Sequence, residues 1–360
     1  MRKERFLCLE CWRSGGVRDV TWSCPRCDDD PGDWTATGPQ RRPVPRRWQA
    51  GVRCSQEEPE IGLCREHREI RVDFLCQDGH RVTFRDGLQD EKLRVLGVAG
   101  PRTAGKTFLM VEMVRKLRHL AEKGDTSLSL SGISTTESRF AVIEGSLHEN
   151  GVKPGPTPTD NDTGRNLAWR VLRTRTGKTH AAGLLALHDA AGETWSNPDL
   201  MERESFTRYL SMIHGLVFLI DGARLAADLG RNVEDAWQSA PATGDSGRAE
   251  RIVLSRLVEL MPGKTAGLAL VISKFDHIAE MSPTLAAPDE GGLEEILKIS
   301  GRADILAAAR NRFGNVRLFA LSSLGFLPGS EDVEDGRLLI PQKLQPIGVV
   351  EPFLFLLDVS

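Results

Sequence analysis

The sequence predicts an α/β protein with a doubly wound, mostly parallel sheet, preceded by a small cysteine-rich module. An apolar segment at 93–98 runs into a glycine-rich turn and then a helical pattern from Phe108 to Leu120, which is typical of a strand, a loop and a helix. Other apolar segments are followed by polar residues, as expected where a parallel sheet binds its ligand. These segments span 181–187, 266–272 and 316–321.

Composition and length indicate a globular protein of two domains. The chain has 360 residues, of which 40% are apolar and 27% are charged. We expect a cysteine-rich module at 1–91 and the main domain at 92–360. The 47 basic and 50 acidic residues give a net charge of −3, which does not support a nucleic-acid partner. No apolar run approaches the ~20 residues of a membrane helix, and no signal-peptide core is present, so we expect a cytoplasmic protein without a membrane span.

All 7 cysteines lie between Cys8 and Cys76. The first four form two Cys-x2-Cys pairs, Cys8 with Cys11 and Cys24 with Cys27. Four thiolates in this spacing can surround one tetrahedral Zn²⁺ ion, and such a closed site is structural because no coordination position stays open. An iron–sulfur cluster uses the same ligand type and is the alternative.

A second group of metal-ligand residues follows in the same module. Cys64-x2-His67 and Cys76-x3-His80 would make a Cys₂His₂ zinc site, with Cys54 either free or replacing one member. The alternative is that His67 is an exposed residue of a charged stretch. A proline- and arginine-rich segment at 39–48 is predicted to be an extended linker, or else a contact for phosphates or an acidic partner.

The turn after the 93–98 segment has the pattern G-x-x-x-x-G-K-T, which is the phosphate-binding loop of nucleotide-binding proteins. Its glycines allow backbone N–H groups to point at a phosphate, its lysine neutralises phosphate oxygens, and its threonine hydroxyl ligates Mg²⁺. The predicted phosphate contacts are Gly100, Thr103, Ala104, Gly105, Lys106, Thr107 and Phe108.

Three later motifs indicate the metal, the terminal phosphate and the base. Asp189 and Gly192 form D-x-x-G after an apolar segment, so we expect Asp189 near Mg²⁺ and Gly192 near the γ-phosphate. Ser273-Lys274-Phe275-Asp276 is close to N/T-K-x-D, in which the carboxylate accepts two guanine N–H groups. A backbone clip for the guanine oxygen is expected at Ser322, Ser323 and Leu324. Asp221, at the end of another apolar segment, is predicted to be a core residue.

Together these motifs resemble the translation-factor-related (TRAFAC) class of P-loop GTPases over about 93–360. The sequence Asp189-Ala-Ala-Gly-Glu193 is similar to the D-T-A-G-Q/E signature of Ras-like members. The cysteine-rich head, the long segment after the first helix and the tail Gly348–Leu357 are similar to the zinc-ribbon-bearing bacterial double-GTPase family. That resemblance implies GTP and GDP binding with Mg²⁺, and a protein partner, such as a second GTPase, in prokaryotic signalling or defence.

Departures from the class pattern predict slow hydrolysis. Glu193 replaces the glutamine that orients water, and a carboxylate cannot donate a hydrogen bond to the γ-phosphate. Arg102 stands where many fast members keep glycine, and its bulk would obstruct an arginine finger supplied by a partner; the alternative is that Arg102 is simply a solvent-exposed charge of the loop. Ser273 replaces Asn or Thr, which would weaken one hydrogen bond. The predicted catalytic residues are Lys106, Glu193 and a switch threonine, that is, a threonine that contacts Mg²⁺ and the γ-phosphate when GTP is bound. Thr157 resembles the family's P-x-x-T-P threonine, with Thr159 as the alternative. A non-hydrolysing adaptor and an ATPase remain as competing functions.

Overall fold

The computed structural model divides the chain into two compact units, Met1–Leu93 and Arg94–Ser360. Each is considered by itself. The residues that the structure describes are 5–8, 14–16, 21–23, 73–75, 81–82, 93–123, 128–132, 136–149, 165–175, 178–189, 204–232, 247–261, 267–281, 288–327, 333–334, 337–338 and 344–358.

The first unit contains two small antiparallel sheets. Strand β1 (Arg5–Leu7) pairs with β2 (Ser14–Gly16), and β4 (Asp73–Leu75) pairs with β3 (Thr21–Ser23) and β5 (Arg81–Val82). Cys8 follows β1 directly, and its side chain is fully buried. The other predicted zinc ligands lie outside the described residues: Cys11, Cys24, Cys27, Cys64, His67, Cys76 and His80. Within the described residues, no cluster of metal-ligand side chains is found.

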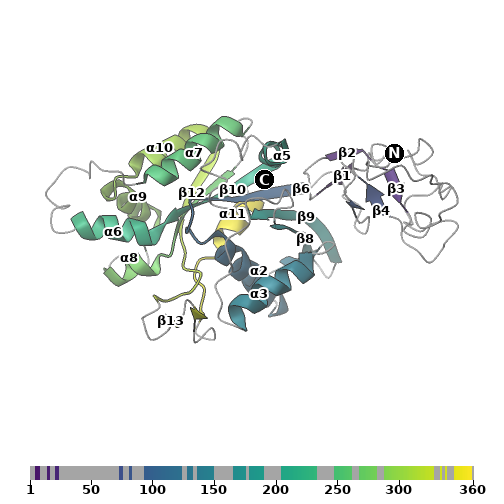
Figure 1. Ribbon diagram of the computed structural model, residues 1–360, viewed down its shortest axis with the longest axis horizontal. Helices are drawn as coiled ribbons and strands as arrows, with labels where there is room; N and C mark the ends of the chain where they lie inside the picture. Colours follow the sequence, from purple (N-terminus) through teal and green to yellow (C-terminus); the bar gives the residue numbers. More distant parts are fainter. Residues whose placement is uncertain are drawn as a thin grey trace, which may run out of the picture. The chain divides into compact units, whose positions relative to one another are not determined.

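A seven-stranded sheet forms the centre of the second unit, in the order β12-β11-β10-β6-β9-β8-β7 (Figure 1). Strand β10 runs parallel to β6 and to β11, and β11 runs parallel to β12, whereas β8 is antiparallel to β7 and β9. The predicted α/β fold with a mostly parallel sheet is therefore confirmed. The strands are β6 (Leu93–Ala99), β7 (Leu128–Gly132), β8 (Arg165–Arg175), β9 (Lys178–Asp189), β10 (Ile213–Asp221), β11 (Gly267–Ser273) and β12 (Asn315–Ala320).

Helices cover both faces of this sheet. On one face, α2, α3 and α11 share a hydrophobic core with alternate residues of the central strands, among them Leu96, Val98, Val217 and Leu219. Helices α7, α9 and α10 gather on the opposite side (Figure 1). The helices are α2 (Lys106–Glu122), α3 (Thr136–His148), α5 (Glu204–Met212), α6 (Gly222–Asn232), α7 (Arg248–Leu260), α8 (Asp276–Met281), α9 (Glu290–Ile299), α10 (Ala303–Arg312) and α11 (Glu351–Asp358).

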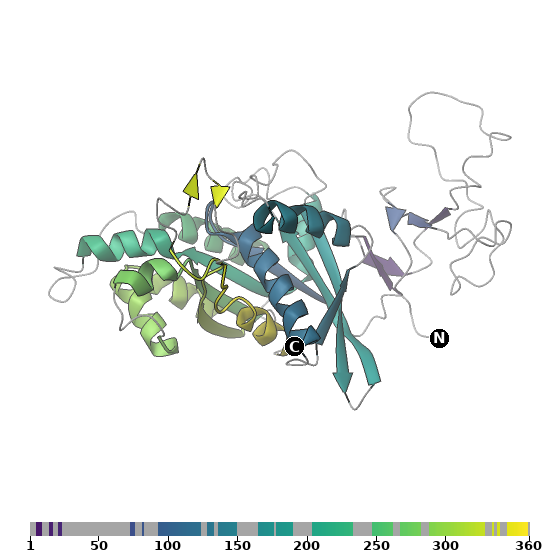
Figure 2. The same cartoon turned by 90° about the horizontal axis from the view of Figure 1, so that it is seen from below.

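Strand β7 and helix α3 lie in the segment after α2 to which the sequence analysis assigned no structure. Helix α3 packs beside α2 (Figure 2), and three polar side-chain pairs join the two helices. Phe140 of α3 meets the buried Trp169 of β8 edge-on, at 5.6 Å between ring centroids. The inserted helix is thus fixed to both the first helix and the sheet. The polar pairs are the ion pairs Arg115–Glu144 and Arg118–Glu137 and the hydrogen bond between Glu112 and His148.

Strand β12 is an edge of the sheet and lies against helix α9. The backbone N–H of Leu318 donates a hydrogen bond of 3.2 Å to a carboxylate oxygen of Glu290, the first residue of α9.

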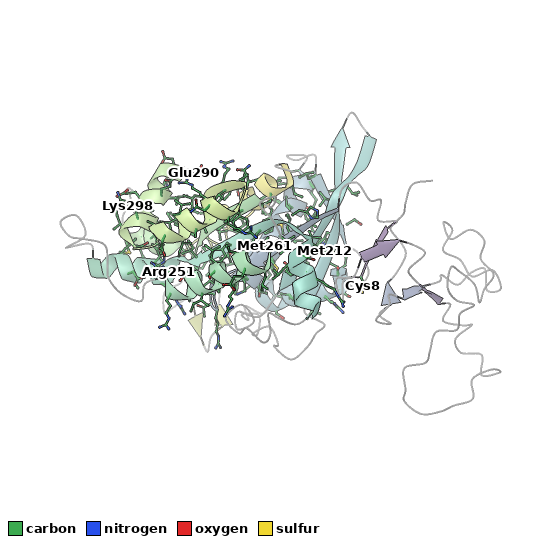
Figure 3. All side chains as sticks on the ribbon, turned by 90° about the horizontal axis from the view of Figure 1, so that it is seen from above. Cys8, Met212, Arg251, Met261, Glu290 and Lys298 are labelled. Carbon is green, nitrogen blue, oxygen red and sulfur yellow. The ribbon has the colours of Figure 1, made fainter. Side chains whose placement is uncertain are left out.

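Figure 3 labels Glu290 and Lys298 on α9, and Arg251 on α7. Hydrogen bonds from Arg251 hold the pKa of Asp304, in α10, below the usual carboxyl value, although burial acts in the opposite direction. Helices α7, α9 and α10 thereby form one connected group beside the edge strand.

The short strands β13 (Val333–Glu334) and β14 (Arg337–Leu338) form a separate antiparallel pair. Among the described helices, none has both the length and the apolar character that a membrane crossing requires.

Candidate functional site

The loop between β6 and α2 has the backbone geometry that its glycines allow. Gly100 has a φ of 152° and Gly105 a φ of 83°, and a Cβ atom on Gly100 would lie 2.8 Å from the carbonyl oxygen of Leu219. Thr103 also lies in the left-handed region, with a φ of 73°. Because α2 begins at Lys106, the loop 100–105 leads directly into the N-terminal end of a long helix. Such a loop aims backbone N–H groups at an anion.

The Lys106 side chain is held inside this loop. Its Nζ atom donates hydrogen bonds to the carbonyl oxygens of Gly100 (3.1 Å) and Pro101 (3.0 Å), and the residue is 8% exposed. Thr107 and Phe108 follow in the first turn of α2 and are half-buried, whereas Ala104 is fully buried. The predicted phosphate contacts therefore lie in the loop 100–105 and in the first turn of α2.

The predicted base-binding residues follow strand β11, all of whose residues are buried. Lys274 has a φ of 50°, and α8 begins at Asp276. The Ser273 hydroxyl donates a 3.0 Å hydrogen bond to the carbonyl oxygen of Ile220, so the residue that replaces the usual Asn or Thr is bonded to β10. The N–H of Phe275 donates to the carbonyl oxygen of Leu321, at 2.9 Å. Hydrogen bonds to the ends of both neighbouring strands thus fix the segment 273–276, which is predicted to bind the base and is called the base loop below.

The predicted backbone clip lies beside this loop. Ser322 is buried, exchanges two backbone hydrogen bonds with Ile347, and accepts a 2.7 Å hydrogen bond on its hydroxyl from the N–H of Gly325. Ser323 and Leu324 are half-buried in the same turn. A pocket of about 630 Å³ is lined by both Asp276 and Ser322. The structure therefore brings the predicted carboxylate and the predicted clip to one cavity, within the size range of small-molecule sites.

Asp221 joins the two loops. Its Oδ2 atom accepts hydrogen bonds from the Lys274 Nζ atom (3.1 Å) and from the Thr103 hydroxyl (3.0 Å), whose single proton is shared with the carbonyl oxygen of Arg102 (2.5 Å). Its Oδ1 atom accepts a 3.1 Å hydrogen bond from the N–H of Ala223, at the start of α6. The residue is 1% exposed. The sequence analysis assigned Asp221 to the core; it is buried, but its carboxylate links the phosphate loop to the base loop.

This link follows from the strand order. Strand β10 lies between β6 and β11 and is parallel to both, so the loops after all three strands emerge at the same edge of the sheet. The signal in the sequence was a carboxylate at the end of an apolar strand, but the sequence alone does not show which strand lies in the middle. A Cβ atom on Gly222 would lie 2.1 Å from the carbonyl oxygen of Ser273, so glycine is required where the two strand ends approach.

The remaining predicted residues are only partly described. Asp189 is the last residue of β9, the neighbour of β6, and its backbone pairs with Arg165. Thr157, Thr159, Gly192 and Glu193 lie outside the described residues.

A parallel sheet whose glycine-rich phosphate loop and base loop meet at one edge defines the class of P-loop GTPase domains. The comparison with family models identifies the family: the Double-GTPase 2 model matches residues 94–332, and the chain belongs to this family.

Comparisons with individual proteins give weaker likenesses. The chain is 26% identical over 205 residues to SaeC of Mycolicibacterium smegmatis, a protein named for ESX-1 scaffolding and assembly. The match covers 56% of this chain and 51% of SaeC, so the chain spans about half the length of that relative.

Similar solved structures include the SAR1 small COPII coat GTPase of Encephalitozoon cuniculi in complex with GDP (15% identity, 75% of this chain and 81% of that chain, TM-score 0.31). The GTPase-like domain of S. cerevisiae Ski7, bound to GDP and phosphate, is also similar (15% identity, 70% and 49%, TM-score 0.32).

Proposed function

We propose that this protein is a guanine-nucleotide switch of the TRAFAC class. It binds GTP and GDP with Mg²⁺, hydrolyses GTP slowly, and changes its contacts with a protein partner according to the nucleotide. The observation that carries the proposal is the pair of hydrogen bonds through which Asp221 holds Thr103 of the phosphate loop and Lys274 of the base loop. One nucleotide can therefore reach both loops.

The phosphate and metal roles follow from the residues at the start of α2. Lys106 would neutralise the β- and γ-phosphate oxygens, and the N–H groups of the loop from Gly100 to Gly105 would bind the β-phosphate. Thr107, in the first turn of α2, and Asp189, at the end of β9, provide the oxygen ligands that Mg²⁺ prefers. The ion would shield the phosphate charge. Gly192 and Thr157 are proposed to contact the γ-phosphate, and Glu193 to accept a hydrogen bond from the attacking water.

Guanine recognition is assigned to Asp276, with the Lys274 side chain covering the base and the turn Ser322–Leu324 binding its oxygen. Replacement of Asp276 by asparagine is expected to weaken GDP binding about a hundredfold, because the carboxylate accepts two N–H groups of guanine and an amide presents a donor there. ADP, which lacks those donors, should be little affected. Competition titration against a fluorescent GDP measures both effects.

The matched control is Glu295→Gln, which removes a carboxylate that is 56% exposed on α9, and this variant should bind GDP like the wild type. If ADP competes with fluorescent GDP as well as GDP does, the protein does not select guanine, as an ATPase would not, and the assignment of Asp276 is wrong.

The competing function is a non-hydrolysing adaptor in which the nucleotide only stabilises the fold. Glu193 and Arg102 are compatible with both functions, because both residues depart from the pattern of fast GTPases. Single-turnover phosphate release separates the two functions, since GTP that stays bound without phosphate release above the buffer rate would identify an adaptor.

The partner and the first unit complete the proposal. The family's name and the assembly role in SaeC's name support a protein partner, and we propose a second GTPase. Residues 1–91 are proposed to form a zinc-ribbon-like module that precedes the nucleotide domain at 92–360 in the sequence. The positions of the strands support this module: Cys8 and Cys11 fall between the paired strands β1 and β2, and Cys76 and His80 fall between β4 and β5.

Metal analysis tests the zinc module directly. The purified full chain is expected to carry at least about one Zn²⁺ per molecule, and Cys8→Ser should remove about one equivalent because a tetrahedral site needs all four ligands. Cys54→Ser is the comparison variant: unchanged zinc would show that Cys54 is free. Wild-type protein without zinc, or with iron and sulfide in its place, would overturn the zinc assignment.

A further inference from the structure

We propose that Asp221 is a positioning residue that couples base recognition to phosphate binding. The inference rests on the proposed function and extends it to a residue outside the nucleotide-binding motifs. Asp221 holds one residue of the phosphate loop and one of the base loop on a single carboxylate oxygen. Movement of either loop would therefore shift Asp221 and alter its hydrogen bond to the other loop.

The chemistry at this position requires a carboxylate. A buried charge is stable only when it is paired and hydrogen-bonded, and Asp221 receives the Lys274 ammonium together with the Thr103 hydroxyl and the Ala223 N–H. Asparagine offers one acceptor oxygen instead of two. Its amide N–H₂ would face either the Ala223 N–H or the Thr103 and Lys274 donors, so at least one donor would lose its partner.

The backbone indicates why the two loops need this support. Among the described residues, Thr103 (φ 73°) and Lys274 (φ 50°) are the non-glycine residues with a positive φ. For residues other than glycine the left-handed conformation is strained, so it persists where surrounding contacts impose it. Both side chains donate to Asp221 Oδ2. The same carboxylate thus holds both strained turns in place.

Pre-ordering of the two loops has a consequence for selectivity. When Asp221 holds the two loops, Lys274 and Asp276 are already positioned to contact guanine, and Lys106 is positioned to contact phosphate. The two loops therefore lose little conformational freedom when the nucleotide binds. Without it, the base loop relaxes independently of the phosphate loop. The preference for guanine over a base that lacks its 2-amino group should then fall, whereas a purely structural loss would weaken all nucleotides equally.

The experiment compares GDP with inosine diphosphate, which lacks that amino group, on the full chain. Asp221→Asn is expected to weaken GDP binding about tenfold or more and to reduce the ratio of GDP to inosine diphosphate affinity severalfold. Thr103→Val should show the same direction of change, because it removes one donor while the Asp221–Lys274 pair stays intact. Thr103→Ser retains the hydroxyl and should restore near wild-type binding.

The outcomes distinguish this inference from the proposed function. A wild-type chain that binds no GDP overturns the proposed function. A wild-type chain that binds GDP, with Asp221→Asn and Thr103→Val retaining both its affinity and its selectivity, overturns the role of Asp221 alone. If Asp221→Asn does not fold, Thr103→Val and Thr103→Ser decide the question. An equal loss of both nucleotides in Thr103→Val would show a structural role and would also overturn the inference.

Discussion

Replacing Lys106 by alanine is expected to weaken GDP binding by a hundredfold or more while the domain stays folded. Lys106 is 8% exposed, and its ammonium lies against the carbonyl oxygens of Gly100 and Pro101, at the inner side of the phosphate loop. Charge-assisted hydrogen bonds are worth about 1.5–3 kcal/mol each, and two bonds to phosphate oxygens correspond to a factor of about 10²–10⁴ in affinity. A fluorescent GDP titration measures the loss.

The control is Lys116→Ala, which removes an exposed lysine from the same helix and should leave GDP affinity unchanged. Circular dichroism of both variants checks the fold. If Lys106→Ala binds GDP within about threefold of the wild type, the loop at 100–105 is not the phosphate site, because so small a change corresponds to less than ~1 kcal/mol.

Replacing Arg302 by alanine is expected to destabilise the second unit by about 3 kcal/mol. Arg302 is 1% exposed and donates hydrogen bonds to the carboxylate of Asp228 in α6 (2.9 Å) and to the carbonyl oxygen of Ser300 (3.0 Å). Truncation would leave these acceptors without their donor and open a cavity. For a domain of this size, the melting temperature should fall by roughly 6–12 °C, measurable by calorimetry.

Two further variants show whether the buried pair causes the effect. Arg310→Ala breaks an exposed pair with Glu294, in which the arginine side chain is 46% exposed, and should change stability by no more than about 1 kcal/mol. Arg302→Met combined with Asp228→Leu removes both charges and should recover part of the lost stability. An Arg302→Ala chain that melts within about 2 °C of the wild type would contradict the prediction.

Much of the central architecture could be predicted because apolar runs and glycine turns are local signals. The predicted segments at 266–272 and 316–321 correspond to β11 (Gly267–Ser273) and β12 (Asn315–Ala320). The turn that the G-x-x-x-x-G-K-T pattern predicts between a strand and a helix lies between β6 and α2, and its Gly100 and Gly105 have positive φ angles, which glycine readily adopts.

The features that sequence reasoning missed depend on contacts between distant segments. The buried face of helix α3 consists mainly of Phe140, Ile143 and Leu147. These residues belong to the core that also contains residues of α2 and Trp169 of β8, and the order of segments along the chain does not reveal this packing. Asp221 was assigned to the core for the same reason. Asp221 can contact both loops because β10 lies between β6 and β11. The order of the strands in this sheet differs from their order in the sequence, so this position was not evident from the sequence.

The hydrogen bond between Glu290 and the Leu318 N–H has a consequence for self-association. An exposed edge strand normally invites another chain to extend the sheet. Here an incoming strand would find the amide of Leu318 already engaged, and would first have to push aside a negatively charged side chain anchored at the start of α9. We therefore expect the contact to disfavour the addition of another strand at Leu318.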